Sequence, residues 1–158
     1  MFEGQLEGIC VADNAGEDMK SIGEVQAIAG KGLAADRYAE GRGAFQKSPA
    51  EPNRQVTLIE QEALEGASAK YGLNLQHPDT RRNLLTCGVP LNHLVGRDFL
   101  VGDVILRGHE LCEPCGYLED HTYEGIKAAL KHRGGLCAEI LQGGLIKVGD
   151  VIRQLGTD

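Results

Sequence analysis

Two cysteines, Cys112 and Cys115, are the residues of this chain best suited to chemistry. They have Cys-x-x-Cys spacing and follow the apolar run 99–106, which we expect to form strands. Pro114 lies between them and cannot donate a backbone hydrogen bond. The strand should therefore stop near Glu113, which places Cys115 on a loop or in a first helical turn. We take Cys115 as the leading candidate for a reactive or metal-binding residue.

Three other interpretations of the cysteine pair remain open. A structural zinc site needs four ligands, and the other cysteines and histidines do not repeat the spacing. Thioredoxin-like exchange needs the motif at a helix start in a βαβ setting, whereas the surrounding pattern indicates hairpins. The pair could also be buried and chemically inert, because cysteine packs like a small apolar residue.

A second group, Arg81, Arg82 and Asn83, begins a predicted strand. Arginine offers a planar fork of donors for phosphate or carboxylate, and an asparagine amide both donates and accepts. The trio therefore suits an anionic ligand rich in heteroatoms. The alternative is a solvated pair of surface arginines.

A third group, His132, Arg133 and Gly134, comes at the end of a predicted helix. Cationic side chains at a helix C-terminus complement its dipole, which gives them a structural reason to be there. Binding of an anion is the functional alternative.

Composition favours one β-rich domain that spans residues 1–158. The chain has 22 glycines but only three Phe, four Tyr and no Trp, which indicates many tight turns between short strands. A formal charge of −7 argues against a nucleic-acid partner, whose phosphates would need excess Lys and Arg. We expect a small-molecule substrate.

The chain has neither an apolar segment of about 18 residues nor a signal-like N-terminus. We therefore expect a soluble, cytoplasmic protein without a membrane partner. Its five cysteines, an odd number, do not resemble a secreted disulfide framework, so free thiols are expected.

Hydrophobic periodicity and turn residues predict an alternation of short strands with two helices. Gly72 should end the first helix, and Gly102-Asp103 should form the bend of a hairpin. A long irregular region is expected at 30–52. The predicted strands are 4–13, 25–29, 55–59, 82–86, the hairpin 99–106, 136–141, 145–148 and 151–153; the predicted helices are 60–71 and 123–132.

Seven motifs in series resemble the MOSC domain family, the C-terminal module of molybdenum cofactor sulfurases that also occurs as small standalone bacterial proteins. The resemblance covers most of the chain and depends on the order of the motifs rather than on any one of them. The motifs are GLAADRY at 32–38, QVTLIE at 55–60, RRNLL at 81–85, LNHLVG at 91–96, VGDV at 101–104, LCEPC at 111–115 and HRGG at 132–135.

The resemblance implies an antiparallel β-barrel with a few short peripheral helices. It also implies a molybdenum cofactor (molybdopterin), with Cys115 as the metal ligand and Cys112 as a neighbour. Arg81 and Asn83 would contact the pterin and phosphate portion, and Arg82 occupies a position that varies in the family. His132, Arg133 and Gly134 could close the anion site from the opposite side.

Two functions follow from the resemblance. The first is reduction of N-hydroxylated compounds, with electrons from an external reductase. The alternative is a sulfur carrier or cofactor-handling module that bears a persulfide on Cys115 and receives sulfur from a donor. The chain also departs from larger relatives, because it has no separate N-terminal barrel, so weak cofactor binding or a need for a partner is expected. Ala35 stands where the family commonly has glycine, which should restrict the backbone there.

Overall fold

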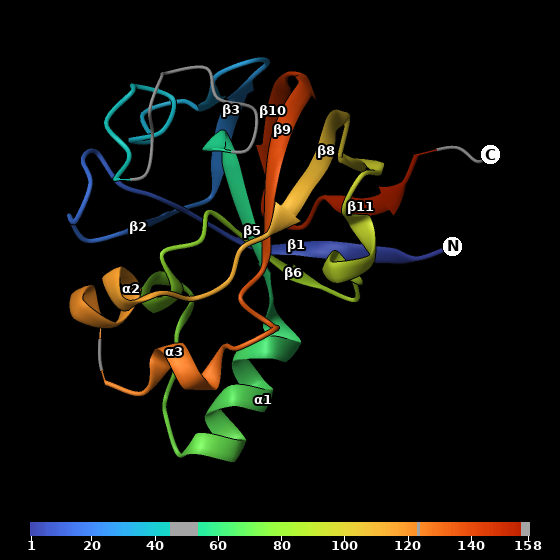
Figure 1. Cartoon of the computed structure of the whole chain (residues 1–158). Coiled ribbons are helices and arrows are strands. Elements are labelled where there is room, and N and C mark those ends of the chain that lie inside the picture. Colours follow the sequence, from blue (N-terminus) through green and yellow to red (C-terminus); the bar gives the residue numbers. More distant parts are fainter. Residues whose placement is uncertain (45–53, 123, 156–158) are drawn as a thin grey trace.

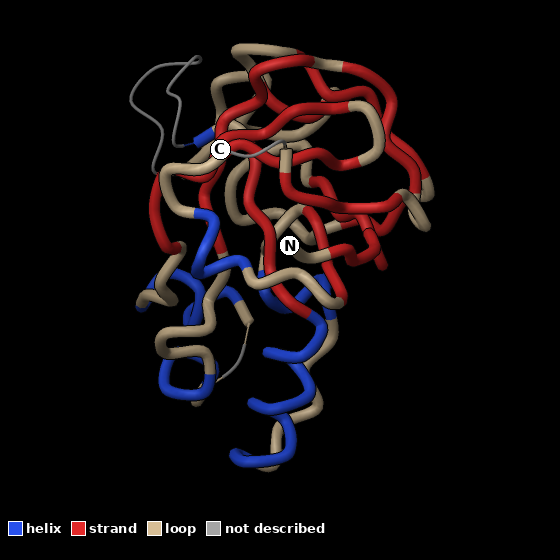
Figure 2. The backbone as a smooth tube through the Cα atoms, turned by 90° about the vertical axis from the view of Figure 1, so that its right-hand side faces the viewer, coloured by secondary structure: helices blue, strands red, loops and turns tan. Residues whose placement is uncertain are grey.

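The computed structural model describes residues 1–44, 54–122 and 124–155. Strands form a barrel at one end of the molecule, and helices gather beneath its other end (Figures 1 and 2). The long region expected at 30–52 is irregular as far as residue 44, apart from one two-residue strand, and its remainder, 45–52, lies outside the described residues.

Seven strands close the barrel in the order β1-β11-β7-β8-β9-β5-β6 and back to β1. Six of the seven neighbouring pairs are antiparallel, and β5 with β6 is the parallel pair. The barrel strands are β1 (Glu3–Val11), β5 (Val56–Glu60), β6 (Leu84–Cys87), β7 (Asp98–Val101), β8 (Val104–Leu111), β9 (Leu136–Gln142) and β11 (Val151–Gln154).

Four further strands extend this framework. β2 (Lys20–Ile22) pairs with the far end of β1. A separate small sheet has the order β10-β3-β4, with β10 (Gly144–Lys147), β3 (Glu24–Ile28) and β4 (Gly32–Leu33). β4 leads directly into residues 34–38, so this sheet places the Asp36-Arg37 segment beside the barrel.

The barrel interior is one apolar core. Inward-facing side chains alternate with outward-facing ones along the barrel strands, as the burial patterns of β7 and β11 show. Phe99, Leu6, Leu58 and Leu106 are among its fully buried members. This core fills the barrel with side chains, so a ligand site must lie outside it.

A second core lies between the lower end of the barrel and the helices. α1 (Gln61–Tyr71) contributes Ala63, Leu64 and Ala67, and it ends at Gly72 with a left-handed φ of 66°. The other helices are α2 (Gly116–His121) and α3 (Ile126–Ala129), with 3₁₀ turns η2 (His77–Thr80) and η3 (Leu91–Leu94). The candidate site lies beside this second core.

The structure confirms the β-rich barrel and corrects some details of the elements. The expected helix 123–132 is shorter, since α3 covers Ile126–Ala129 and Tyr123 lies outside the described residues. α2 begins directly after Cys115, in agreement with the expectation of a loop or first helical turn there, although no range was predicted for this helix. β5 and β6 are parallel because α1 and η2 form a crossover between them, an arrangement that a hairpin pattern does not anticipate. In the described part of the chain, no helix has the length and apolar character needed to cross a membrane.

Candidate functional site

The Cys-x-x-Cys segment connects β8 to α2, at the junction of the barrel and the helices (Figure 1). The Cys112 N–H donates a hydrogen bond of 2.8 Å to Gly135 O, which continues the pairing of β8 with β9 by one residue. The chain then turns at Pro114, and Cys115 is the residue before α2. The predicted break at Pro114 is therefore present, and both cysteines are half-buried.

Both thiol residues line a cavity of about 90 Å³ between the barrel and α2. Four arginines and a single carboxylate residue, Glu113, are among its lining residues. The lining residues are Arg37, Tyr38, Arg54, Thr57, Arg81, Arg82, Cys112, Glu113, Cys115, Tyr117 and Leu118. An excess of fixed positive charge beside two thiols is suited to an anionic ligand.

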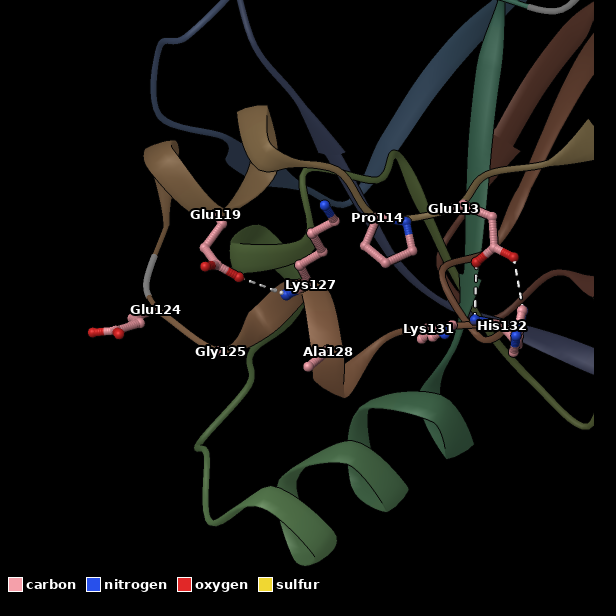
Figure 3. Close-up of a pocket in the computed structure, with 9 residues that line it drawn as sticks. All are labelled: Glu113, Pro114, Glu119, Glu124, Gly125, Lys127, Ala128, Lys131 and His132. Atoms are coloured by element: carbon pink, nitrogen blue, oxygen red, sulfur yellow. Dashed lines mark hydrogen bonds and ion pairs between the residues drawn. The ribbon is translucent and has the colours of Figure 1, made fainter.

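The Glu113 carboxylate does not neutralise these arginines. It accepts hydrogen bonds from the His132 backbone N–H at 2.9 Å and from His132 Nδ1 at 3.0 Å, on the outer side of the segment (Figure 3). These interactions lower the pKa of Glu113 despite the opposing effect of desolvation. Glu113 therefore connects the Cys-x-x-Cys segment to His132, in the loop that leads into β9. It does not cancel the positive charge of the cavity.

Arg37 is held in the cavity wall by a network of buried groups. Asp36 accepts a 3.0 Å hydrogen bond from Arg37 Nη1, and its carboxylate also accepts from the backbone N–H groups of Ala12 and Tyr38. Arg37 Nη2 donates to Arg81 O at 3.3 Å. The Arg37 guanidinium also lies 4.8 Å from the centre of the Tyr38 ring. The Asp36-Arg37 pair thus fixes the position of a neighbouring arginine backbone.

Arg81 carries an unsatisfied donor at this site. Arg81 is buried, and its Nη1 donates to Glu17 O at 2.7 Å. Nη2 is buried and has no hydrogen-bond partner among the described residues. Burial and then the nearby charge of Arg37 lower the pKa of Arg81. An anion near this guanidinium would offset both unfavourable effects, because it would supply an acceptor and an opposite charge.

The two thiols differ in their surroundings. A hydrogen bond from Cys137 and the charges of Arg82 and Arg54 lower the pKa of Cys112, against the effect of burial. The paired Cys137 thiol on β9 has a raised pKa. Cys115 packs against the second core, near Leu118. All five cysteines are free thiols, and no cluster of three or more His, Cys, Asp or Glu suited to a metal is present among the residues described.

Arg82 and Asn83 have structural partners. Arg82 Nε donates to Gly134 O and Nη2 to Cys112 O, both at 2.8 Å. This side chain thus connects the residues just before β6 to the cysteine segment, and it also lines the cavity. Asn83 is buried away from the cavity. Its Oδ1 accepts from the Thr57 N–H at 3.0 Å, and its Nδ2 donates to Cys10 O at 3.0 Å.

The third predicted group lies apart from the arginine cavity. Arg133 is directed toward α1, where its Nη1 occupies the space next to Gly66. Gly134 is buried against the Cys112 carbonyl, and His132 is exposed. The structure thus brings Arg81, Arg82 and Cys115 to one cavity. The other predicted residues are not among those that line it: Asn83, His132, Arg133 and Gly134.

His132 instead borders a larger, open groove of about 710 Å³ on the other side of the Cys-x-x-Cys segment (Figure 3). α2 and α3 form much of this groove, which contains Lys127 and Lys131 together with Glu119 and Glu124. Its charges are mixed, and no thiol is among its lining residues. Despite its size, the groove is therefore a weaker candidate for the chemistry than the arginine cavity.

Sequence reasoning missed several residues of the cavity: Arg37, Tyr38, Arg54, Thr57, Tyr117 and Leu118. Arg37 and Tyr38 belong to the motif at 32–38 and Thr57 to the motif at 55–60, so their place in those motifs was the available signal. Arg54 and Tyr117 had no such signal, because only the folded barrel brings them to the cysteines.

Comparisons with known proteins agree with this arrangement. Residues 45–153 match the MOSC domain. Among solved structures, the YuaD protein from Bacillus subtilis has a TM-score of 0.77 at 16% identity, covering 96% of this chain and 97% of its own. YiiM from Geobacillus stearothermophilus has a TM-score of 0.73 at 14% identity, covering 97% and 75%. YiiM from Escherichia coli has a TM-score of 0.70 at 14% identity, covering 98% and 71%. No curated protein matches the chain.

The closed barrel places the chain in the class of small β-barrel domains, with an arginine-lined cavity beside the helices. Within that class, the match over residues 45–153 is specific. The chain belongs to the MOSC domain family.

Proposed function

We propose that the protein binds the molybdenum cofactor at the arginine cavity and reduces N-hydroxylated small molecules. The observation that carries this proposal is the cavity itself, in which four arginines and two thiol residues meet. The buried, unpartnered Nη2 of Arg81 adds a donor that an anionic group could satisfy. The residues present therefore fit an anionic cofactor with a soft, thiol-binding metal.

Arg37, Arg54 and Arg81 would hold the negatively charged end of the cofactor. At about 90 Å³ the cavity is below the range of about 300–1,000 Å³ typical of sites for whole ligands, so it would take one end of a larger molecule. Cys115, half-buried at the edge of this cavity, would be the protein ligand of the metal. When bound, the cofactor supplies two-electron redox chemistry, and the electrons come from an external reductase.

The chain's own residues have three tasks in this proposal. Arg82 holds the Cys112 carbonyl, which fixes the entry to the Cys-x-x-Cys turn. Asp36 holds Arg37, and Arg37 holds the Arg81 backbone. These contacts orient the donors before the ligand arrives, which lowers the ordering cost of binding.

The metal content of purified protein tests this proposal. From a host that makes the cofactor, we expect near-stoichiometric molybdenum in the parent protein and in Cys87→Ser, and at least a tenfold loss in Cys115→Ser. Cys87 is a suitable control because it is also half-buried but is not a lining residue of the cavity. Reduction of an N-hydroxylated base with an artificial electron donor should follow the metal content. A parent protein without molybdenum, or a fully loaded Cys115→Ser variant, would contradict the assignment.

A second function, sulfur carriage, is favoured by a separate observation. Cys112 lines the same cavity, and its pKa is lowered by Cys137 and by the neighbouring arginines. A thiolate is the form that accepts sulfur. In this proposal a cysteine of the cavity bears a persulfide, and sulfane sulfur bound to protein from a host without the cofactor would be its signature.

A further inference from the structure

Cys112 is a thiol that the cofactor proposal leaves without a role. Its backbone is fixed on both sides, by the N–H bond to Gly135 O and by the Arg82 bond to its own carbonyl. Its residue lines the cavity, and Cys137 lies behind it on the neighbouring strand. A cysteine whose backbone is fixed in this way, in the lining of a charged cavity, lies next to whatever the cavity holds.

The size and charge of the cavity restrict that reactant. A volume of about 90 Å³ is on the order of three water molecules' share of liquid. Its lining includes Arg37, Arg54, Arg81 and Arg82. Asp36 pairs with Arg37, and the Glu113 carboxylate is occupied by His132 on the outer side, so the excess of positive charge comes from the other three arginines. A small, multiply charged oxyanion fits both restrictions, because each oxygen can accept from a guanidinium N–H.

We propose that Cys112 accepts sulfane sulfur from a small oxyanionic donor of the thiosulfate class bound among these arginines. This inference rests on the second proposed function, sulfur carriage, and specifies its donor and its receiving thiol. The Cys112 thiolate attacks the outer sulfur of thiosulfate, a sulfur–sulfur bond forms, and the original sulfur–sulfur bond breaks. Sulfite leaves with the electron pair, so Cys–S⁻ and S₂O₃²⁻ give Cys–S–S⁻ and SO₃²⁻.

The arginines have a chemical role in this step besides binding. The leaving sulfite carries a double negative charge, and fixed guanidinium groups stabilise charge that develops on the leaving oxyanion. Arg81, with its unpartnered Nη2, has a donor still to be satisfied. The thiolate character of Cys112 supplies the nucleophile near neutral pH.

The test uses the full chain purified from a host without the cofactor. Incubation with thiosulfate should add one sulfur atom, a mass increase of about 32 Da, and release one equivalent of sulfite. After alkylation of the thiols and the persulfide, tandem mass spectrometry of the peptide that contains both cysteines should place the added sulfur on Cys112. The two positions can be distinguished because the peptide fragments readily before Pro114, which lies between them. Cys112→Ser should lose the label and Cys115→Ser should retain it. Label on Cys115 alone, or none on the parent protein, would overturn the inference.

Anion recognition is tested by changing the arginine and by changing the donor. Arg81→Met should raise the thiosulfate concentration for half-maximal sulfite release at least tenfold, whereas Arg107→Met should not change it. Arg107 is an exposed arginine paired with Asp98 and is not a lining residue of the cavity. Inorganic sulfate should compete with thiosulfate but not with polysulfide, a sulfur donor without an oxyanion group. Equal rates in the parent and both arginine variants would contradict an anion site.

The outcomes also separate this inference from the functions on which it builds. Labelling of Cys112 by polysulfide but not by thiosulfate would leave sulfur carriage intact and remove the oxyanionic donor. Failure of both donors to label any cysteine would remove sulfur carriage as well. Molybdenum binding that depends on Cys115 is measured on separate protein and stands or falls independently.

Discussion

His77 shows how a single buried residue supports the site. Its Nε2–H donates to Arg82 O at 2.9 Å, and its Nδ1 lies 3.5 Å from the Cys10 thiol. Burial lowers the pKa of His77 from its usual value near 6.5 to about 4. The imidazole is therefore neutral in the folded protein at neutral pH, and it holds the backbone of an arginine that in turn holds Cys112.

We expect this histidine to make the fold sensitive to acid. The unfolded chain binds the proton with a pKa near 6.5 and the folded chain only near 4, so the stabilising contribution is complete above pH 6.5 and is lost as the pH falls toward 4. Between pH 7.5 and 4.5 this residue alone should remove about 2–3 kcal/mol from the free energy of unfolding. Urea unfolding at the two pH values measures the loss.

The matched variants are His77→Gln and His109→Gln. The first should be less stable at pH 7.5 but should lose less stability on acidification than the parent. The second removes a partly exposed histidine paired with Glu139 and should leave most of the acid response in place. An unchanged acid response in His77→Gln would refute this explanation.

Backbone strain is concentrated around the arginine cavity and the cysteine segment. Ala35, Arg81 and His132 are the non-glycine residues with positive φ in the described part of the chain, at 66°, 59° and 63°. Ala35 immediately precedes Asp36-Arg37, Arg81 lines the cavity, and His132 binds Glu113. Such conformations persist where surrounding contacts determine them, and they are frequent at functional sites. Ala35 thus adopts the left-handed conformation that favours glycine, although its Cβ was expected to restrict the backbone there.

At the scale of elements, the loop that leads into β9 supports the cysteine segment. Gly134 is buried against this segment, and its carbonyl accepts from Arg82 Nε. A Cβ on Gly134 would overlap the Cys112 carbonyl oxygen and press on Pro114. The position of Cys112 therefore requires a residue without a side chain at position 134.

Gly134→Ala should displace the Cys112 turn and destabilise the fold by about 1–3 kcal/mol, because backbone atoms must move to admit the methyl group. The change is measured by the urea midpoint and by the rate at which iodoacetamide labels Cys112. Gly23→Ala is the control, since an added Cβ there meets no atom within 4 Å and φ is not positive. Equal stability of the two variants would show that the turn is not constrained in this way.

The elements also show what the sequence could and could not predict. The hairpin of β7 and β8 and the end of α1 at Gly72 follow from local periodicity and turn residues, and both are confirmed. The parallel pairing of β5 with β6 depends on where α1 packs, which no local pattern states. Cys115 and Arg81 could be nominated from their motifs, whereas the contribution of Arg54 and Tyr117 depends on long-range folding.

At the scale of the whole molecule, the site depends on barrel closure. β1 pairs with β11 at Glu3–Arg153, Gly4–Ile152 and Gln5–Val151, and this seam joins the two ends of the described chain (Figure 1). Within β11, Ile152 is fully buried and Val151 is 41% exposed. The two neighbours therefore face opposite sides of the same strand.

Ile152→Ala should cost about 2–5 kcal/mol because it leaves a cavity in the barrel core. Val151→Ala should cost less than about 1 kcal/mol, because only cross-strand contact at the surface is reduced. Thermal or urea unfolding of the two variants makes the comparison. Similar losses in both would mean that β11 does not seal the core.

The seam also has a consequence for biosynthesis. β1 is synthesised well before one of its partners in the barrel, β11, which is the last strand of the described chain. Contacts between such distant segments form slowly, and strand edges are prone to aggregation until they are paired. The apolar face around Leu6 is thus incompletely covered until translation of residues 151–154 is finished. A nascent chain stalled before that point should engage chaperones, because the barrel that carries the arginine cavity closes only when β11 pairs with β1.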